Sequence, residues 1–186
     1  DLAPVELTTA QLKAANFTID GVSVPTNSKI YFYGDKSTVR VELPADFIAA
    51  TGTRTLSVTN IVDEDGNKLS KTAAHVKSDI TVTENVTPKA LSLSLKDAHN
   101  VLVQMSEELA GAPTTGIELW VNGVKVTASD VAFALVADSY TNDTILKLTT
   151  TAKTLSNSDA IVVKFLDTND AADAAGNTAK VGQVSK

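Results

Sequence analysis

The chain has 186 residues, a length that suits two domains of about 90 residues each. Hydrophobic residues make up 43% of it, which supports a packed core, while its net charge of −6 opposes binding to nucleic acid or to an anionic membrane surface. It contains no cysteine, so disulfides, thiolate metal sites and thiol nucleophiles are excluded. No apolar run approaches the roughly 20 residues that span a bilayer, so we expect no membrane insertion.

Short alternating stretches predict antiparallel strands. Val39, Val41 and Leu43 fall on one face of residues 38–43, opposite polar side chains, which is the period of a half-buried strand. Further strands are expected at 75–83, at 90–96 with Leu91, Leu93 and Leu95 on one face, at 101–105, at 131–137 and at 161–166.

Helical signal is weak by comparison. Residues 8–16 could form one or two turns beginning at Thr8 or Thr9, and residues 44–52 could form another that ends at Gly52. Neither stretch is long enough to organise a fold. We therefore expect an all-β protein.

Two segments of the chain occur twice. FTIDGVSV at 17–24 is similar to LWVNGVKV at 119–126, and the segment 55–67, which ends in DEDGN, is similar to 160–177, which ends in DAAGN. Repeats of this length predict two copies of one domain fold. Asp-Gly and Gly-Asn pairs favour tight turns, so the two closing motifs are interpreted as the same turn in each copy.

The repeat divides the chain into two domains, 1–86 and 87–186, joined at the polar linker 83–88. The second copy opens with the alternating stretches 90–96 and 101–105, and nothing similar stands ahead of the first copy. We therefore expect the first domain to lack its opening strand, and the chain to be a piece of a longer protein. A missing strand would leave a sheet edge unpaired.

The order of these motifs resembles that of the Ig-like repeats of surface-layer (S-layer) proteins from Gram-positive bacilli. VLVQMSEELAG at 101–111, the VNG turn at 121–123 and the closing D…GN of Asp63–Asn67 and Asp173–Asn177 carry the resemblance. Met105-Ser106-Glu107 stands where the family usually has Phe-Ser-Glu. The resemblance covers nearly the whole chain, as about one and three-quarter repeats.

The resemblance implies two tandem immunoglobulin-like β-sandwich domains with a structural role. Such a segment would belong to a secreted protein that assembles with neighbouring copies into a lattice on the bacterial cell wall. Other domains of a parent chain would be its further partners, and calcium is a candidate cofactor, because lattices of this family often depend on it. The alternative is a binding or accessory module, since similar domains occur in adhesins and in secreted carbohydrate-active enzymes. The absence of cysteine suits the cytosol as well as a Gram-positive cell surface.

No arrangement of residues predicts catalysis. The chain has two histidines, His75 and His99, and neither lies in a nucleophile motif. The acid pair Glu107-Glu108 is not by itself a glycosidase site. We expect no catalytic residues and no enzymatic activity.

Calcium is the more specific possibility, because it binds carboxylate, amide and carbonyl oxygens. The candidate ligands are Asp63 and Asp65 in the first closing loop, and Asp167, Asn169, Asp170 and Asp173 in the second. Neither loop is an EF-hand, since the sixth residue from Asp63 is Lys68 and not glycine. A turn is the preferred interpretation of the first loop, and for the second loop a turn and a calcium site remain open.

Trp120 is the single tryptophan and lies in the predicted strand before the VNG turn. Core or edge packing is the ordinary role of such a residue. An exposed aromatic platform around it would instead favour the carbohydrate-binding alternative.

Overall fold

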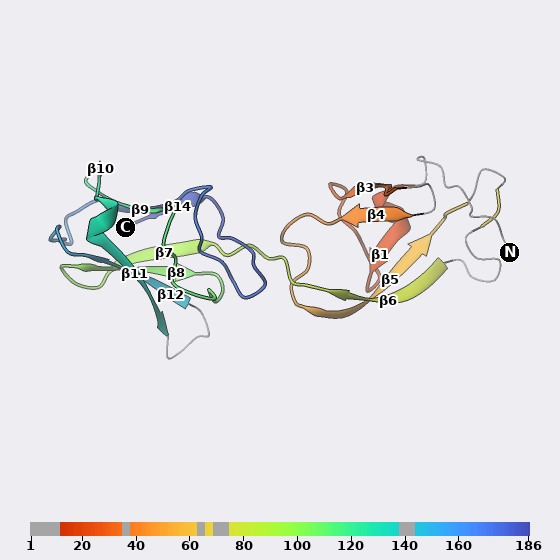
Figure 1. Cartoon of the computed structure of the whole chain (residues 1–186), viewed down its shortest axis with the longest axis horizontal. Helices are drawn as coiled ribbons and strands as arrows, with labels where there is room; N and C mark the ends of the chain where they lie inside the picture. The colour runs from red at the N-terminus through yellow and green to blue at the C-terminus, as the bar shows by residue number, and fades with distance from the viewer. Residues whose placement is uncertain (1–11, 35–37, 63–65, 69–74, 138–143) are drawn as a thin grey trace. The chain divides into compact units, whose positions relative to one another are not determined.

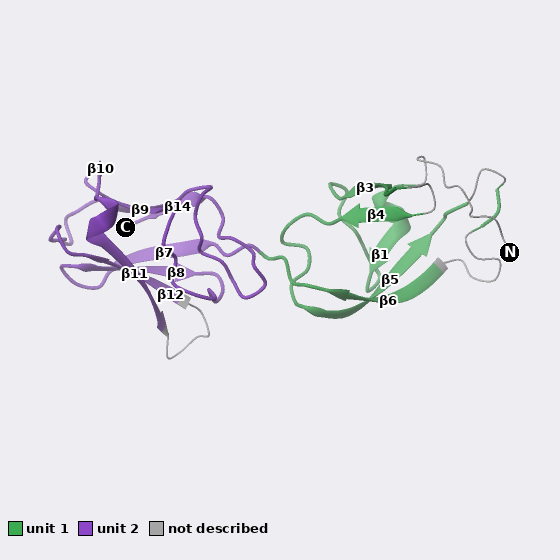
Figure 2. Cartoon of the chain, viewed as in Figure 1, with its two compact units in different colours: residues 1–86 green, residues 87–186 purple. Residues whose placement is uncertain are grey.

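The computed structural model of the chain describes residues 12–34, 38–62, 66–68, 75–137 and 144–186. The chain folds into two compact units, Asp1–Val86 and Thr87–Lys186 (Figure 2). Each unit is built from antiparallel β-sheets (Figure 1), which confirms the predicted all-β fold with two sandwich domains. The described helices are single 3-10 turns, and none has the length or apolarity needed to cross a bilayer.

Unit 2 packs two four-stranded sheets around one core. Their orders are β10-β9-β13-β14 and β11-β12-β8-β7. Val103, Leu119, Leu146 and Val163 come from central strands of both sheets, and none is exposed by more than 1%. The elements are β7 (Ala90–Leu95), β8 (Asn100–Met105), β9 (Ile117–Val121), β10 (Val124–Lys125), η3 (Ala128–Asp130), β11 (Val131–Ala137), β12 (Thr144–Thr150), β13 (Ile161–Phe165) and β14 (Gly182–Ser185).

Unit 1 has the same strand sequence with a smaller second sheet. One sheet has the order β2-β1-β5-β6, and the other contains β3 and β4. The elements are η2 (Ala14–Asn16), β1 (Phe17–Ile19), β2 (Val22–Ser23), β3 (Lys29–Phe32), β4 (Val39–Glu42), β5 (Gly52–Thr59) and β6 (His75–Val82). The sequence predicted one missing opening strand, whereas both β7 and β8 lack a counterpart in the part of unit 1 that the structure describes.

The turn after β1 and the turn after β9 make the same hydrogen bonds. Asp20 and Asn122 have φ values of 49° and 53°, and the glycine after each also has positive φ, as the tightest hairpin connections require. Asp20 exchanges two bonds with Thr55: its N–H donates to the Thr55 carbonyl at 2.9 Å, and its Oδ1 accepts the Thr55 N–H at 2.8 Å. Asn122 makes the same two bonds with Ala160, at 2.8 and 2.9 Å. The two copies therefore share one turn design.

The same kind of bridge flanks both closing motifs. Isolated antiparallel bridges stand on either side of them, Val62 with Lys68 and Ala172 with Thr178. Gly66 and Gly176 have φ values of 82° and 90°, a conformation that favours glycine. The turn interpretation is confirmed for the second motif, where the Gly176 N–H donates to the Asp173 carbonyl at 3.2 Å. In the first motif Asp63 and Asp65 lie outside the described residues, so the turn stays a prediction there.

Leu91 departs from the predicted alternation. Ala90 pairs with Met105 and Ser92 with Gln104, so Leu91 is the extra residue of a β-bulge. Its side chain is 60% exposed, and Ala90 packs against the core instead. A single extra residue reverses the faces of a strand, which the pattern of leucines does not reveal.

Residues 44–52 form turns rather than the predicted helical turn. Asp46 has a φ of 67°, which is incompatible with a right-handed helix. Asn85 stabilises this non-helical conformation, because its Oδ1 accepts the N–H of Ile48 at 2.7 Å and its Nδ2 donates to the Pro44 carbonyl at 2.9 Å. Of the other predicted turn, 14–16 is a 3-10 turn and 8–11 lie outside the described residues.

Candidate functional site

The closing loop of unit 2 carries most of the candidate calcium ligands, and Asp170 joins it to the loop before β9. Its Oδ1 accepts the N–H groups of Thr114 and Thr115 at 2.9 and 3.0 Å, and its Oδ2 accepts the Thr114 hydroxyl at 2.6 Å. Burial alone would raise the pKa of Asp170, but these hydrogen bonds outweigh it and lower the pKa. The carboxylate therefore fixes the loop before β9.

Asp173 caps the closing turn itself. It is 7% exposed, and its two oxygens accept the backbone N–H of Asn177 at 2.9 Å and the Asn177 Nδ2 at 2.8 Å. Burial opposes the charge, yet the bonds from Asn177 and from the turn's N–H groups hold the pKa of Asp173 below its ordinary value. Asp173 is thus an ionised turn cap.

Asn169 crosses the same loop and is 6% exposed. Its Nδ2 donates to the carbonyls of Leu166 and Ala179 at 2.6 and 3.0 Å. Its Oδ1 is buried and has no hydrogen-bond partner among the described residues. Gly116 packs against this backbone so closely that a Cβ there would lie 2.2 Å from the Asn169 Cα, and its φ of 70° independently favours glycine.

The structure brings only some of the predicted ligands near other acids. Asp167 is exposed, and neither Asp167 nor Asp170 joins a close group of three or more acidic or histidine side chains in the described part of the chain. A carboxylate oxygen of Asp173 lies within 4.8 Å of one from Glu107. The bond from the Ala110 N–H to the Ala172 carbonyl, at 2.8 Å, draws these segments together.

In the sequence, Glu107 stands out only as a member of the acid pair Glu107-Glu108. Its closeness to Asp173 depends on a contact between residues more than 60 positions apart, so no local motif signals it. Two adjacent carboxylates are a donor set that suits a hard cation such as calcium. Binding of calcium stays a prediction.

The outer face of β9 carries a second cluster of charged and aromatic side chains. Glu118 accepts Lys125 Nζ at 2.6 Å and Trp120 Nε1 at 2.9 Å. These two hydrogen bonds, the one from Lys125 first, lower the pKa of Glu118. The ammonium of Lys164 lies 3.8 Å from the centroid of the Trp120 ring, so it occupies one face of that half-buried ring.

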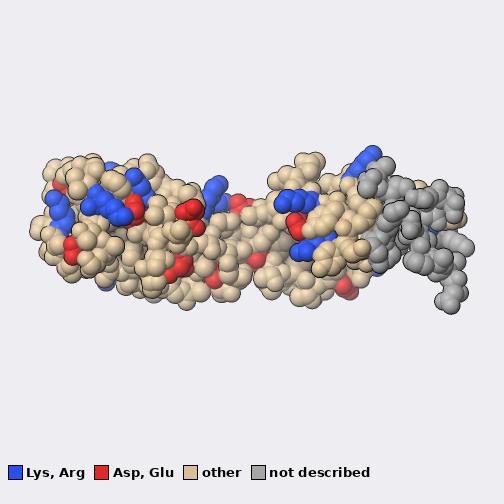
Figure 3. Space-filling model, turned by 45° about the horizontal axis from the view of Figure 1, so that its top comes forward, with Lys and Arg blue, Asp and Glu red and all other residues tan. Residues whose placement is uncertain are grey.

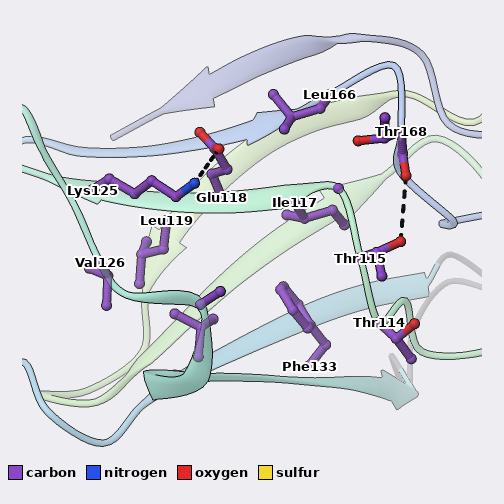
Figure 4. A pocket seen from close by; sticks show the side chains of 13 residues that line it. Thr114, Thr115, Ile117, Glu118, Leu119, Lys125, Val126, Phe133, Leu166 and Thr168 are labelled. Atoms are coloured by element: carbon purple, nitrogen blue, oxygen red, sulfur yellow. Dashed lines mark hydrogen bonds and ion pairs between the residues drawn. The ribbon is translucent and has the colours of Figure 1, made fainter.

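A cavity of about 250 Å³ opens beside this cluster, between the edges of the two sheets of unit 2. Ile117 and Leu119 from β9 and Phe133 from β11 supply its apolar lining (Figure 4). Thr115 and Thr168 line its polar side, where the Thr115 hydroxyl donates to the Thr168 carbonyl at 3.4 Å. Ligand pockets usually measure about 300–1,000 Å³, so this one suits a small polar group or one side chain.

His99 belongs neither to the charged cluster on β9 nor to the cavity lining. The ring Nδ1 of His99 is 3.2 Å from the Thr150 carbonyl, and its backbone N–H donates to Asp97 Oδ1 at 2.9 Å. The contact with Asp97 stabilises the turn between β7 and β8, and the contact with Thr150 joins this turn to the end of β12. His75 begins β6, and its side chain lies outside the described part.

No family model matches the chain, and no curated protein matches it. Among solved structures it is similar to one described as "Crystal Structure of Rst D1-D2", with a TM-score of 0.36 and 10% sequence identity. That alignment covers 91% of this chain and 82% of the other. The fold assignment of this chain therefore stands on its own strand pairing.

Proposed function

We propose that this chain is a structural segment of a bacterial surface-layer protein. Its Ig-like sandwich domains would pack against neighbouring copies, and against other domains of the parent chain, in a lattice outside the cell wall. The observation that carries the proposal is the repetition of one sandwich design, down to the paired hydrogen bonds of Asp20 with Thr55 and of Asn122 with Ala160. Repeated modules of one design suit an extended array.

The chemistry of the polar residues supports a structural role. Asp170, Asp173 and Asn169 each bond to the backbone of the loops around them, which stiffens the end of unit 2. Figure 3 shows lysine and arginine side chains interspersed with acidic ones on the face in view. A mixed surface of this kind suits the polar rim of a lateral contact between subunits. We propose no enzymatic activity.

Assembly is tested directly with the purified chain. Negative-stain electron microscopy and analytical ultracentrifugation, over a range of protein concentrations in millimolar calcium, should show concentration-dependent ordered sheets. The same samples in EDTA serve as the control for calcium dependence. A chain that stays monomeric at all concentrations in both buffers would contradict the proposal.

Calcium belongs to this proposal as a candidate cofactor bound near Asp173 and Glu107. Mass action predicts stabilisation of unit 2 by about 2.7 kcal/mol when calcium is at a hundred times its dissociation constant. Glu107→Gln should abolish the shift in melting temperature, whereas Asp130→Asn, which changes an acid on η3, should retain it. Identical melting curves in EDTA and in millimolar calcium would refute the calcium site.

The alternative is a binding or accessory module of an adhesin or of a secreted carbohydrate-active enzyme. The cavity beside Glu118 and the nearby Trp120 favour it, although Lys164 already covers one face of the tryptophan ring. Because Trp120 is the single tryptophan, its fluorescence reports sugar binding at this place. Saturable quenching by soluble cell-wall or plant polysaccharides, without assembly, would favour this alternative over the lattice.

A further inference from the structure

Strand β11 forms one edge of its sheet in unit 2. Within the residues that the structure describes, it pairs with β12 alone, over 131–137 and with no shift of register. Alternate residues of an antiparallel strand direct their backbone N–H and C=O groups to opposite sides. The side of β11 away from β12 therefore presents a row of backbone donors and acceptors that another strand could pair with.

This edge lacks the features by which edge strands usually avoid pairing with another chain, namely short length, charge, proline and bulges. β2 and β10 have two residues each, β6 carries Lys77 and Asp79, and β7 has the bulge at Leu91. β14 has four residues, and so does β3, the counterpart of β11 in unit 1, which begins with Lys29. The sequence of β11 is VAFALVA, seven residues without charge, proline or glycine.

The outer face of β11 is also apolar. Phe133 and Leu135 pack against the core of unit 2, so Ala132, Ala134 and Val136, which alternate with them, lie on the face away from the core. The solvated face of an antiparallel sheet usually carries polar side chains. A second strand could therefore approach β11 without burying a charge of this strand.

The inner side chains at this edge are incompletely covered. Phe133 and Leu135 are half-buried, whereas Leu146 and Leu148 of the neighbouring strand β12 are 0% exposed. Phe133 also forms part of the wall of the cavity of about 250 Å³ beside β9 (Figure 4). Both faces of β11 thus have apolar surface that a further strand would cover.

A second copy of β11 fits this edge. Antiparallel pairing centred on Ala134 would place Ala132 opposite Val136 and Phe133 opposite Leu135. Outer side chains would then meet outer ones, and inner side chains would meet inner ones. Two copies of a chain with a net charge of −6 repel each other, and an uncharged strand adds no like charges to their contact. The pairing has twofold symmetry, so it closes at a dimer.

We propose that β11 is a dimerisation edge, at which unit 2 pairs with unit 2 of a second copy and joins their two sheets into one. Main-chain hydrogen bonds would give the affinity, and the match of Phe133 with Leu135 would join the two cores. One strand pair is a small contact, below the roughly 1,200 Å² of standard interfaces, so we expect weak association that repetition in an array would strengthen. The biological role of the dimer rests on the proposed lattice, although the dimer forms without one.

Sedimentation velocity of the intact chain, from about 1 μM to about 1 mM, tests for the dimer. We expect a monomer–dimer equilibrium. At the highest concentration, hydrogen exchange should slow by about fivefold or more at alternate amides of residues 131–137, because pairing protects them.

A charge at the centre of the contact tests the strand and its register. Ala134→Lys would place two ammonium groups opposite each other, beside Lys147 of β12, and should raise the dissociation constant about tenfold or more. Ser94→Lys is the matched control, because it puts the same charge on exposed β7 at the other edge of the same sheet. It should leave the dissociation constant unchanged.

Charge rescue separates lost pairing from misfolding. A one-to-one mixture of Ala134→Lys with Ala134→Glu should form a mixed dimer more tightly than Ala134→Lys pairs with itself, because opposite charges then face each other. The proposal is wrong if the unaltered chain stays monomeric up to about 1 mM. It is also wrong if Ala134→Lys and Ser94→Lys behave alike, or if the mixture gives no gain.

Electron microscopy of the same variants distinguishes this contact from the lattice. Ordered sheets that form equally well from Ala134→Lys would support the lattice and overturn the β11 contact. A dimer that Ala134→Lys disrupts, but that never grows into sheets, would support the contact and contradict the lattice.

Discussion

Unit 1 and unit 2 build the same sheet around the same turn, β2-β1-β5-β6 in one and β10-β9-β13-β14 in the other. Among the described residues, four buried apolar side chains form the main core of unit 1, and sixteen form that of unit 2. Burial of apolar surface contributes about 25 cal/mol per Å² to folding, so the second unit gains far more from the hydrophobic effect. Turns and strand order can therefore be preserved between copies while stability is not.

The largest effect we expect is separate unfolding of the two units. Unit 2 should have a free energy of unfolding within the usual range of about 5–15 kcal/mol, and unit 1 should fall at or below its lower limit. In urea, Trp120 fluorescence reports unit 2, while far-ultraviolet circular dichroism reports both units. Two transitions are expected, with the fluorescence change in the later one. If the two probes instead gave coincident transitions, the prediction that unit 1 is less stable than unit 2 would be wrong.

A pair of matched valines tests the core directly. Val163 is 0% exposed, and Val58 stands at the matching position but is half-buried. Val163→Ala should lower the free energy of unfolding of unit 2 by about 2–3 kcal/mol, because it removes buried methyl groups and leaves a cavity. Val58→Ala should cost unit 1 less than about 1 kcal/mol. Equal costs in urea denaturation would mean that the two cores are equally packed.

Asn85 stabilises the segment before β5 of unit 1 through side-chain hydrogen bonds to its backbone. Asn85→Ala removes bonds to Ile48 and Pro44 and leaves their backbone groups without that partner, so we expect a loss of about 1–3 kcal/mol. The loss should be confined to the unit 1 transition. Asn27→Ala, at an exposed position, is the control and should change stability by less than about 0.5 kcal/mol.

The smallest expected effect is a dependence of unit 2 on acid pH. The pKa values of Asp170 and Asp173 are lowered in the folded state, so their contribution to stability is complete above the ordinary aspartate value of 3.8. It is lost as the pH falls from 3.8 through the lowered values. The urea midpoint of unit 2 should therefore decline below about pH 4, and Asp170→Asn should make that decline shallower. If the variant kept the same pH profile, Asp170 would not contribute to the acid dependence of unit 2.

Local patterns predicted most of the strands. The alternating or apolar runs at 75–83, 101–105, 131–137 and 161–166 coincide with β6, β8, β11 and β13, because period-two burial depends mainly on neighbouring residues. The bulge at Leu91 and the turns at 44–52 were not predicted. The first depends on pairing with β8, and the second on a side chain, Asn85, that lies far along the chain.

The candidate site was predicted less completely than the fold. Sequence composition located the acidic loop 167–173, but it could not show that Asp170 and Asp173 accept hydrogen bonds from nearby backbone groups. It also gave no sign that Glu107 lies beside Asp173, because the two come together only when the end of β8 meets the closing loop. The arrangement of candidate metal ligands depends on contacts between residues that are far apart in the sequence.

The sequence by itself determined the all-β class, the twofold repeat and the glycine-containing turns, since each rests on residue type and short-range spacing. Tertiary structure alone decided how deeply each apolar side chain is buried, which acids serve as turn caps, and which strand edges find a partner. Val58 and Val163 are the same residue on matching strands, yet only Val163 is fully buried. The reason is that burial depends on the strands packed opposite, and β7 and β8 supply them to unit 2.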